Sequence, residues 1–95
     1  MRRAAKIDAN HVQIVSALRA AGATVQSLAE CGRGVPDILA GYKGQTFLIE
    51  VKNGQLAPSA RELTKAQIEW HVNWRGGACV VVNSPDEALA AIGAL

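Results

Sequence analysis

The sequence predicts an α/β domain in which one mixed sheet is flanked by helices and a short helix follows at the C-terminal end. Two apolar, β-branched segments are joined by a tight Lys43-Gly44 turn, which is typical of an antiparallel hairpin. Segments with helical periodicity lie on both sides of that hairpin, and the apolar segment ACVVVN separates the last two of them. The predicted order is α-β-β-β-α-β-α, for which one mixed sheet with helices on its faces is the natural architecture.

The first half of the chain is predicted to form a helix, a strand and the hairpin. Residues 8–21 repeat apolar side chains at helical spacing, and Gly22 follows where a C-terminal cap is expected. The segment 24–30 is predicted to be a short strand, and two glycines and a proline mark the loop after it. Residues 36–42 and 45–52 are predicted to be the hairpin strands.

The second half is predicted to add two helices with a strand between them. After the polar segment 53–63, which is predicted to be irregular, Thr64 and Gln67 form a T-x-x-Q capping box that predicts the start of a helix. Residues 78–83 follow as a buried strand. The last helix is predicted to open with a second capping box and a proline at its first position, from Ser84, Pro85 and Glu87.

Size and composition limit the possible functions. The 95 residues are enough for one small domain, which is predicted to span residues 1–95. A net charge of +2 is too small to indicate a nucleic-acid partner by itself. Two cysteines without a CxxC spacing argue against a structural zinc site. No apolar run of bilayer length and no signal-peptide segment is present, so a cytoplasmic location without a membrane partner is expected.

The hairpin carries the strongest functional signal. With Lys43 and Gly44 as the two central turn residues, the register places Asp37 directly across from Glu50 on one face. Lys52 lies two residues beyond Glu50 and therefore shares that face. The opposite face is predicted to be apolar: Ile38, Ala40, Phe47, Ile49 and Val51.

This charged face predicts metal-assisted hydrolysis of a phosphodiester. Two like charges directly opposed destabilise a hairpin unless a positive charge lies between them. Lys52 supplies part of this compensation, and Mg²⁺ or Mn²⁺ can supply the rest, because carboxylate oxygens are hard ligands. Lys52 would stabilise charge on the phosphate or help to deprotonate the attacking water. A surface salt bridge is the alternative, but the combination of Pro-Asp, the cross-strand register and Glu-x-Lys favours a site.

The stretch GVPDILAGYKGQTFLIEVKNG, residues 34–54, resembles the core motif of the PD-(D/E)XK nuclease superfamily. Its G-x-P-D and E-V-K spacing, followed by the LTKAQIEW helix, resembles that of a stand-alone VRR-NUC domain protein of the phage and bacterial type. The resemblance covers nearly the whole chain. It implies a restriction-endonuclease-like αβββαβ core, similar in order to archaeal Holliday-junction resolvases, and a location in a bacterial or phage-infected host cell.

The resemblance also implies roles for individual residues. The catalytic residues that it implies are Asp37, Glu50, Lys52 and Gln67. Asp37 and Glu50 would bind the metal, together with the main-chain carbonyl of Val51. Gln67 matches a glutamine of the family's second helix, and its capping role with Thr64 is an equal alternative.

The first helix departs from the family pattern. Family members have a glutamate there that completes the acidic cluster, and this helix contains none. Asp8 is the nearest acid and is one carbon shorter, and it fits a helix cap as well as a metal ligand. Asn10 and Gln13 are further alternatives that would bind the metal through water.

Loops on either side of the hairpin are expected to contact DNA. Arg33 and the backbone of Gly34 lie in the glycine-rich loop that leads to Asp37, and an exposed arginine without a ligand is the alternative for Arg33. Ser59 and Arg61, in the loop after the second hairpin strand, are expected to contact DNA on the same grounds.

The expected function is structure-selective cleavage of branched, Holliday-junction-like DNA by a homodimer, because a symmetric cut of a four-way junction needs two active sites. A flap-type nuclease is one alternative. The other is a catalytically weak DNA-binding or assembly module, which the missing helix glutamate favours. Trp70 and Trp74 form an aromatic ridge at helical spacing that is either core packing or a subunit interface.

Overall fold

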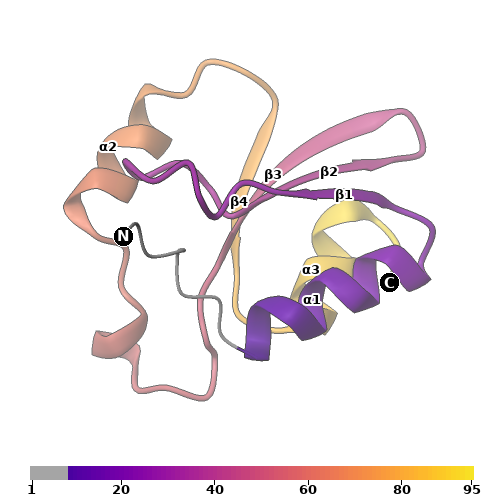
Figure 1. Ribbon diagram of the computed structural model, residues 1–95, viewed down its shortest axis with the longest axis horizontal. Coiled ribbons are helices and arrows are strands. Elements are labelled where there is room, and N and C mark those ends of the chain that lie inside the picture. Colours follow the sequence, from indigo (N-terminus) through magenta and orange to yellow (C-terminus); the bar gives the residue numbers. More distant parts are fainter. Residues whose placement is uncertain (1–8) are drawn as a thin grey trace, which may run out of the picture.

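The computed structural model describes residues 9–95, and Figure 1 shows how its helices and strands are arranged. The elements in chain order are α1 (Ala9–Ala20), β1 (Thr24–Ser27), β2 (Ile38–Tyr42), β3 (Gln45–Val51), the 3₁₀ helix η1 (Pro58–Arg61), α2 (Lys65–Asn73), β4 (Ala78–Val82) and α3 (Pro85–Ile92). The predicted order of helices and strands is confirmed, and η1 forms in the segment predicted to be irregular. Within the described part of the chain, no helix is long and apolar enough to cross a membrane.

The four strands form one mixed sheet in the order β1-β2-β3-β4. β1 and β3 are each antiparallel to β2, whereas β4 is parallel to β3. The predicted hairpin register is confirmed, since Tyr42 pairs with Gln45 and Ile38 pairs with Ile49. Lys43 and Gly44 have φ values of 49° and 80°, the positive angles that a two-residue turn of type I′ requires.

β1 and β2 are shorter than the sequence predicts. β1 ends at Ser27 rather than Glu30, and β2 begins opposite it at Ile38. Proline lacks the N–H group needed for a ladder hydrogen bond, so Pro36 prevents the pairing from continuing past this point. The residue after Pro36 is Asp37, which is therefore placed at the exact end of the antiparallel ladder.

The hydrophobic core lies between one face of the sheet and the helices α1 and α3, which pack side by side in Figure 1. Both helices and the strands β2, β3 and β4 contribute fully or nearly fully buried side chains: Ile14, Leu18, Ile38, Ala40, Phe47, Ile49, Val82, Ala88 and Ile92. The predicted apolar face of the hairpin is thus confirmed, with Val51 packed at the border of the core. Each fully buried Ile or Leu side chain contributes about 1.5–3 kcal/mol through the hydrophobic effect.

The opposite face of the sheet is covered only in part, by α2. This helix has no buried residue, so polar and aromatic contacts rather than a second core hold it in place. The Trp70 and Trp74 rings stack with centroids 5.0 Å apart, and the Trp74 indole donates a hydrogen bond to the carbonyl of Gly77 (2.9 Å). Trp74 is 38% exposed and neither ring belongs to the core cluster, so core packing is not the role of this aromatic pair.

The capping predictions differ in outcome between the two helices. For α2 the capping box is confirmed, with both reciprocal hydrogen bonds between Thr64 and Gln67. For α3 only half of it forms. Ser84 Oγ accepts from the N–H of Glu87, but the Glu87 carboxylate accepts from the N–H of Asn83 at 2.8 Å instead of returning to Ser84. Asn83 Nδ2 donates to the same Glu87 oxygen. This second hydrogen bond favours Asn83 over Ser84 as the partner of the Glu87 carboxylate.

The loop before Asp37 packs directly on the first turn of α2 at Gly34. A Cβ atom added to Gly34 would overlap the carbonyl group of Ala66, and the positive φ of 82° is itself unfavourable for other residues. Gly34→Ala is therefore expected to lower the free energy of unfolding by more than about 2 kcal/mol, as measured by urea denaturation. Gly32→Ala is the matched control, because Gly32 also has positive φ but has open space around its Cα. Equal losses for the two variants would contradict the predicted contact with α2.

Candidate active site

Asp37 is held against the neighbouring strand by its own side chain. Its Oδ2 accepts a hydrogen bond from the main-chain N–H of Val51 at 2.8 Å, and its main-chain carbonyl accepts one from Leu28 at 2.7 Å. A carboxylate that accepts from a backbone N–H forms a charge-assisted hydrogen bond of fixed direction. The Asp37 side chain is therefore directed along the end of β3 rather than into solvent.

Glu50 is the buried acid of the structure, with only 1% of its surface exposed. Its Oε2 accepts a hydrogen bond from Gln67 Nε2 (3.1 Å), whereas Oε1 is buried and has no hydrogen-bond partner within residues 9–95. Burial and, to a smaller extent, the neighbouring Asp37 carboxyl group raise the pKa of Glu50 to about 8, against the lowering effect of Lys52. Asp37 and Glu50 therefore lie next to each other, as the register predicts. Without a further cation, the pair favours the state in which one proton is bound between the two carboxyl groups.

Gln67 connects the lysine, the buried glutamate and the start of α2. Its Oε1 accepts from Lys52 Nζ and from the main-chain N–H of Thr64, each at 2.8 Å, and its Nε2 donates to Glu50. The sequence left two roles open for Gln67, as helix cap or as member of the site. The same side chain does both, because its two polar atoms face different partners.

A comparison with solved structures found a chain described as a VRR_NUC domain, with a TM-score of 0.62 and 27% sequence identity. The aligned region covers 85% of this chain and 87% of the other. The chain is therefore similar to a VRR-NUC domain over most of its length. The predicted resemblance and the predicted fold class are thereby confirmed, and the match indicates a nuclease domain. Neither a protein-family model nor a curated protein matches the sequence significantly.

Helix α1 approaches the site through Asn10. Asn10 Nδ2 donates to the main-chain carbonyls of Lys52 (2.6 Å) and Asn83 (3.3 Å). Asn10 therefore joins α1 to the ends of β3 and β4, a positioning role that its place in the sequence did not indicate. Gln13 is exposed one turn further along α1. Asp8, predicted to be either a metal ligand or a helix cap, lies outside the described residues.

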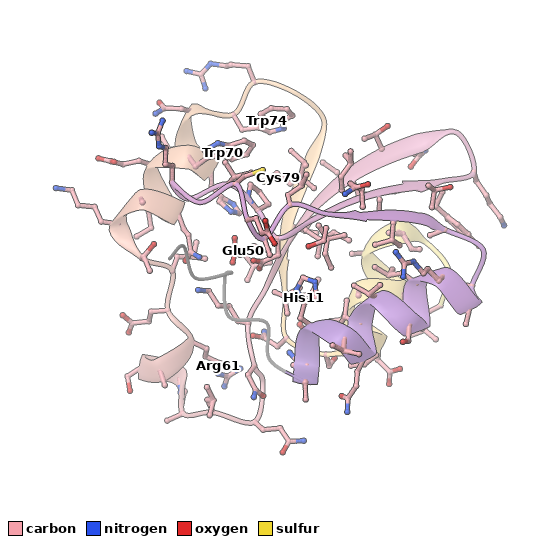
Figure 2. The ribbon with its side chains drawn as sticks, in the orientation of Figure 1. His11, Glu50, Arg61, Trp70, Trp74 and Cys79 are labelled. Atoms are coloured by element: carbon pink, nitrogen blue, oxygen red, sulfur yellow. The ribbon has the colours of Figure 1, made fainter. Side chains whose placement is uncertain are left out.

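The four residues expected to contact DNA separate into two groups. Arg33 is exposed with φ of 58°, and Gly34 follows it in the loop that packs on α2. Ser59 and Arg61 lie on η1, and in Figure 2 Arg61 lies below Glu50, whereas α2 lies above and to the left of it.

Cys79 and His71 are neighbours of the site that no sequence motif indicated. The parallel register pairs Cys79 with Leu48, on the face that carries Glu50, and Cys79 Sγ lies 3.5 Å from His71 Nδ1. Burial raises the pKa of the Cys79 thiol, and the charge of Glu50 raises it further, so this thiol is not an activated nucleophile. Figure 2 shows it between Trp70 and Glu50.

The donor set of the site fits a hard divalent cation. Within residues 9–95 no three His, Cys, Asp or Glu side chains are grouped to hold a metal, so the described chain offers the pair Asp37 and Glu50. A buried Glu50 oxygen without a partner, beside a second carboxyl group, is the arrangement that Mg²⁺ or Mn²⁺ relieves. Mg²⁺ in particular is commonly held by one or two carboxylates and keeps several waters.

Proposed function

We propose that this VRR-NUC-like domain is a divalent-metal-dependent DNA endonuclease. The observation that carries the proposal is the convergence of Asp37, Glu50, Lys52 and Gln67, from the hairpin and α2, into one hydrogen-bonded group with an unpartnered buried carboxyl oxygen. Asp37, Glu50 and the main-chain carbonyl of Val51 would hold Mg²⁺ or Mn²⁺, which supplies a Lewis acid for a phosphoryl oxygen when bound.

Lys52 has the geometry of an electrostatic catalyst in this proposal. Its hydrogen-bond partner is the neutral amide of Gln67 rather than a carboxylate, so its positive charge remains available to a phosphate. A fixed cation aimed at the phosphate stabilises the negative charge that develops on it in the transition state. Gln67 holds Lys52 and Glu50 in fixed relative positions, so no entropy has to be lost to order these side chains during the reaction.

Branched, Holliday-junction-like DNA and a homodimer are the finer parts of the proposal. A small domain has room for one such site, and two sites related by a two-fold axis are needed for paired cuts. The sheet face that α2 leaves uncovered supports a subunit contact, because it exposes Leu39 and Val81 and forms an open, apolar hollow of about 230 Å³ beside Thr24 and Thr46.

A panel of matched four-way junctions, flaps, duplexes and single strands, incubated with Mg²⁺ or Mn²⁺, tests the proposal. Paired symmetric nicks in the junction, absent in EDTA, are expected. Cleavage restricted to flaps would identify the flap as the substrate and would contradict the junction part of the proposal. If folded protein with either metal cuts none of the four DNAs, the endonuclease proposal is wrong.

A DNA-binding or assembly module is the second candidate function. It is favoured by one observation, that the described chain offers two acids to a metal and no third one beside them. This candidate predicts DNA binding that weakens with salt, persists in EDTA and is never accompanied by metal-dependent cleavage. Binding and cleavage measured on the same four DNAs therefore separate the two candidates.

A further inference from the structure

A polar cavity of about 310 Å³ lies at the carboxyl ends of the parallel strands β3 and β4. Its wall is formed mainly by polar side chains from α1, from η1 and from the segments that follow the two strands, including Asn10, Gln13, Gln55, Arg61, Asn83 and Glu87. In open α/β sheets the space beyond the carboxyl ends of parallel strands is where ligands commonly bind. None of these side chains belongs to the acidic pair or to the Lys52–Gln67 contact.

Arg61 is the positively charged group of this cavity wall. It is half-buried, and its Nε is buried without a hydrogen-bond partner within residues 9–95. A guanidinium group has five N–H donors, and a buried donor without an acceptor costs about 1–3 kcal/mol. The nearby Glu87 carboxylate accepts two hydrogen bonds from Asn83 through Oε1, so the ordered contacts of this acid are with the β4 end rather than with Arg61.

The cavity is connected to the proposed catalytic group by one side chain. Asn10 lines the cavity and donates to the main-chain carbonyl of Lys52 at 2.6 Å. The cavity therefore begins next to the residue that directly follows β3. Gln13 and Gln55 are exposed amides on the same wall and add neutral donors to the one arginine. The wall thus offers one cation and several neutral donors, beside the Glu87 carboxylate, whose ordered contacts are with Asn83. Such a donor set suits a monoanion with several acceptor oxygens, which a phosphodiester is.

We propose that this cavity binds a backbone phosphate of the DNA, next to the strand segment that is cut, with Arg61 as its principal ligand. The inference deepens the proposed function and rests on it, because the same DNA molecule occupies the Asp37–Glu50 site. Arg33, in the loop that leads to Asp37, would contact another part of the same DNA. The site positions the substrate and takes no part in the chemical step.

The test is a binding measurement that needs no cleavage. Single uncharged methylphosphonate linkages are placed one at a time along a junction DNA, and dissociation constants are measured in EDTA for the wild type and for Arg61→Met, which keeps the apolar stem of the side chain. One linkage is expected to weaken wild-type binding about tenfold, and Arg61→Met to weaken binding of unmodified DNA to a similar extent. Arg61→Met combined with that linkage is expected to weaken binding no more than either change alone, because both changes remove the same contact.

Three further variants sharpen the test. Arg19→Met removes an arginine at the other end of α1, which donates a hydrogen bond to the carbonyl of Val25, and is expected to weaken binding equally at every linkage. Glu87→Gln keeps an acceptor for Asn83 but removes the negative charge of the cavity, and is expected to tighten binding about two- to fivefold. Arg61→Lys restores the charge and is expected to recover part of the sensitivity to the critical linkage.

The outcomes separate this inference from the proposed function. Strict additivity of Arg61→Met with every linkage would overturn the phosphate site, and so would coupling to a 5′-terminal phosphate only, measured on the same DNA with and without that group. A protein that cuts DNA but shows no such coupling keeps its function and loses this site. A protein that shows the coupling but never cuts keeps the site and is a binding module.

Discussion

Replacing Lys52 with alanine is expected to lower the rate of DNA cleavage by about 10²–10⁴-fold while the protein remains folded. The reason is local. Lys52 is half-buried and donates to Gln67, whose Oε1 keeps a second donor in the main-chain N–H of Thr64 after the substitution. No buried acceptor is therefore left unsatisfied, and the capping box of α2 is retained.

Single-turnover cleavage of the preferred DNA in Mn²⁺, together with urea denaturation, measures this effect. Lys43→Asn is the matched control, because it removes one lysine charge at the tip of the hairpin, and asparagine tolerates the positive φ of that position. We expect the control to cleave within about twofold of the wild type, as is usual for surface changes away from a site. A Lys52→Ala protein that cleaves as well as the control would show that Lys52 has no catalytic role.

Replacing Glu50 with glutamine is expected to abolish metal-dependent cleavage and to change how stability depends on pH. Because burial raises the pKa of Glu50 to about 8, from 4.5 for an ordinary glutamate, the folded protein binds this proton more tightly than the unfolded chain. Below pH 4.5 Glu50 is protonated in both the folded and the unfolded protein, so it causes no loss of stability there. As the pH rises from there towards 8, the metal-free wild type loses stability on the order of a few kcal/mol, and above 8 the loss is complete.

Glu50→Gln has no ionisable group at this position and is expected to lack this loss, so in EDTA it should be the more stable protein at pH 8 and differ little near pH 4.5. Urea denaturation of both proteins across this range gives the difference, in which other titrating groups largely cancel. Added Mn²⁺ should stabilise the wild type more as the pH rises, because the metal competes with the proton on Glu50, and should have little effect on the variant. Parallel pH curves for the two proteins would contradict the raised pKa.

The predictability of the hairpin has a physical explanation. Its register depends on a two-residue turn and on the alternation of side chains along two adjacent strands, and both are local properties. Tyr42 pairs with Gln45 as predicted, so Asp37 and Glu50 take the opposed positions. The T-x-x-Q capping box of α2 was equally visible, because it depends on only four consecutive residues. Two local predictions were inaccurate for reasons outside the local sequence. β1 is shorter than predicted because its partner strand begins at Ile38, and the Glu87 carboxylate of α3 binds Asn83 instead of Ser84.

What the sequence determined by itself is therefore the order of the elements, the hairpin register and the pair of acids with Lys52 on one face. Only the tertiary structure decided that Gln67 joins Lys52 to Glu50, that Asn10 joins α1 to the strand ends, and that Arg61 lies in a separate cavity without a partner within residues 9–95. These residues come from segments far apart in the chain, and their contacts depend on how helices pack on the sheet. The burial that raises the pKa of Glu50 has the same origin, because α2 and the sheet together exclude water from a carboxyl group that the sequence alone leaves on an open face.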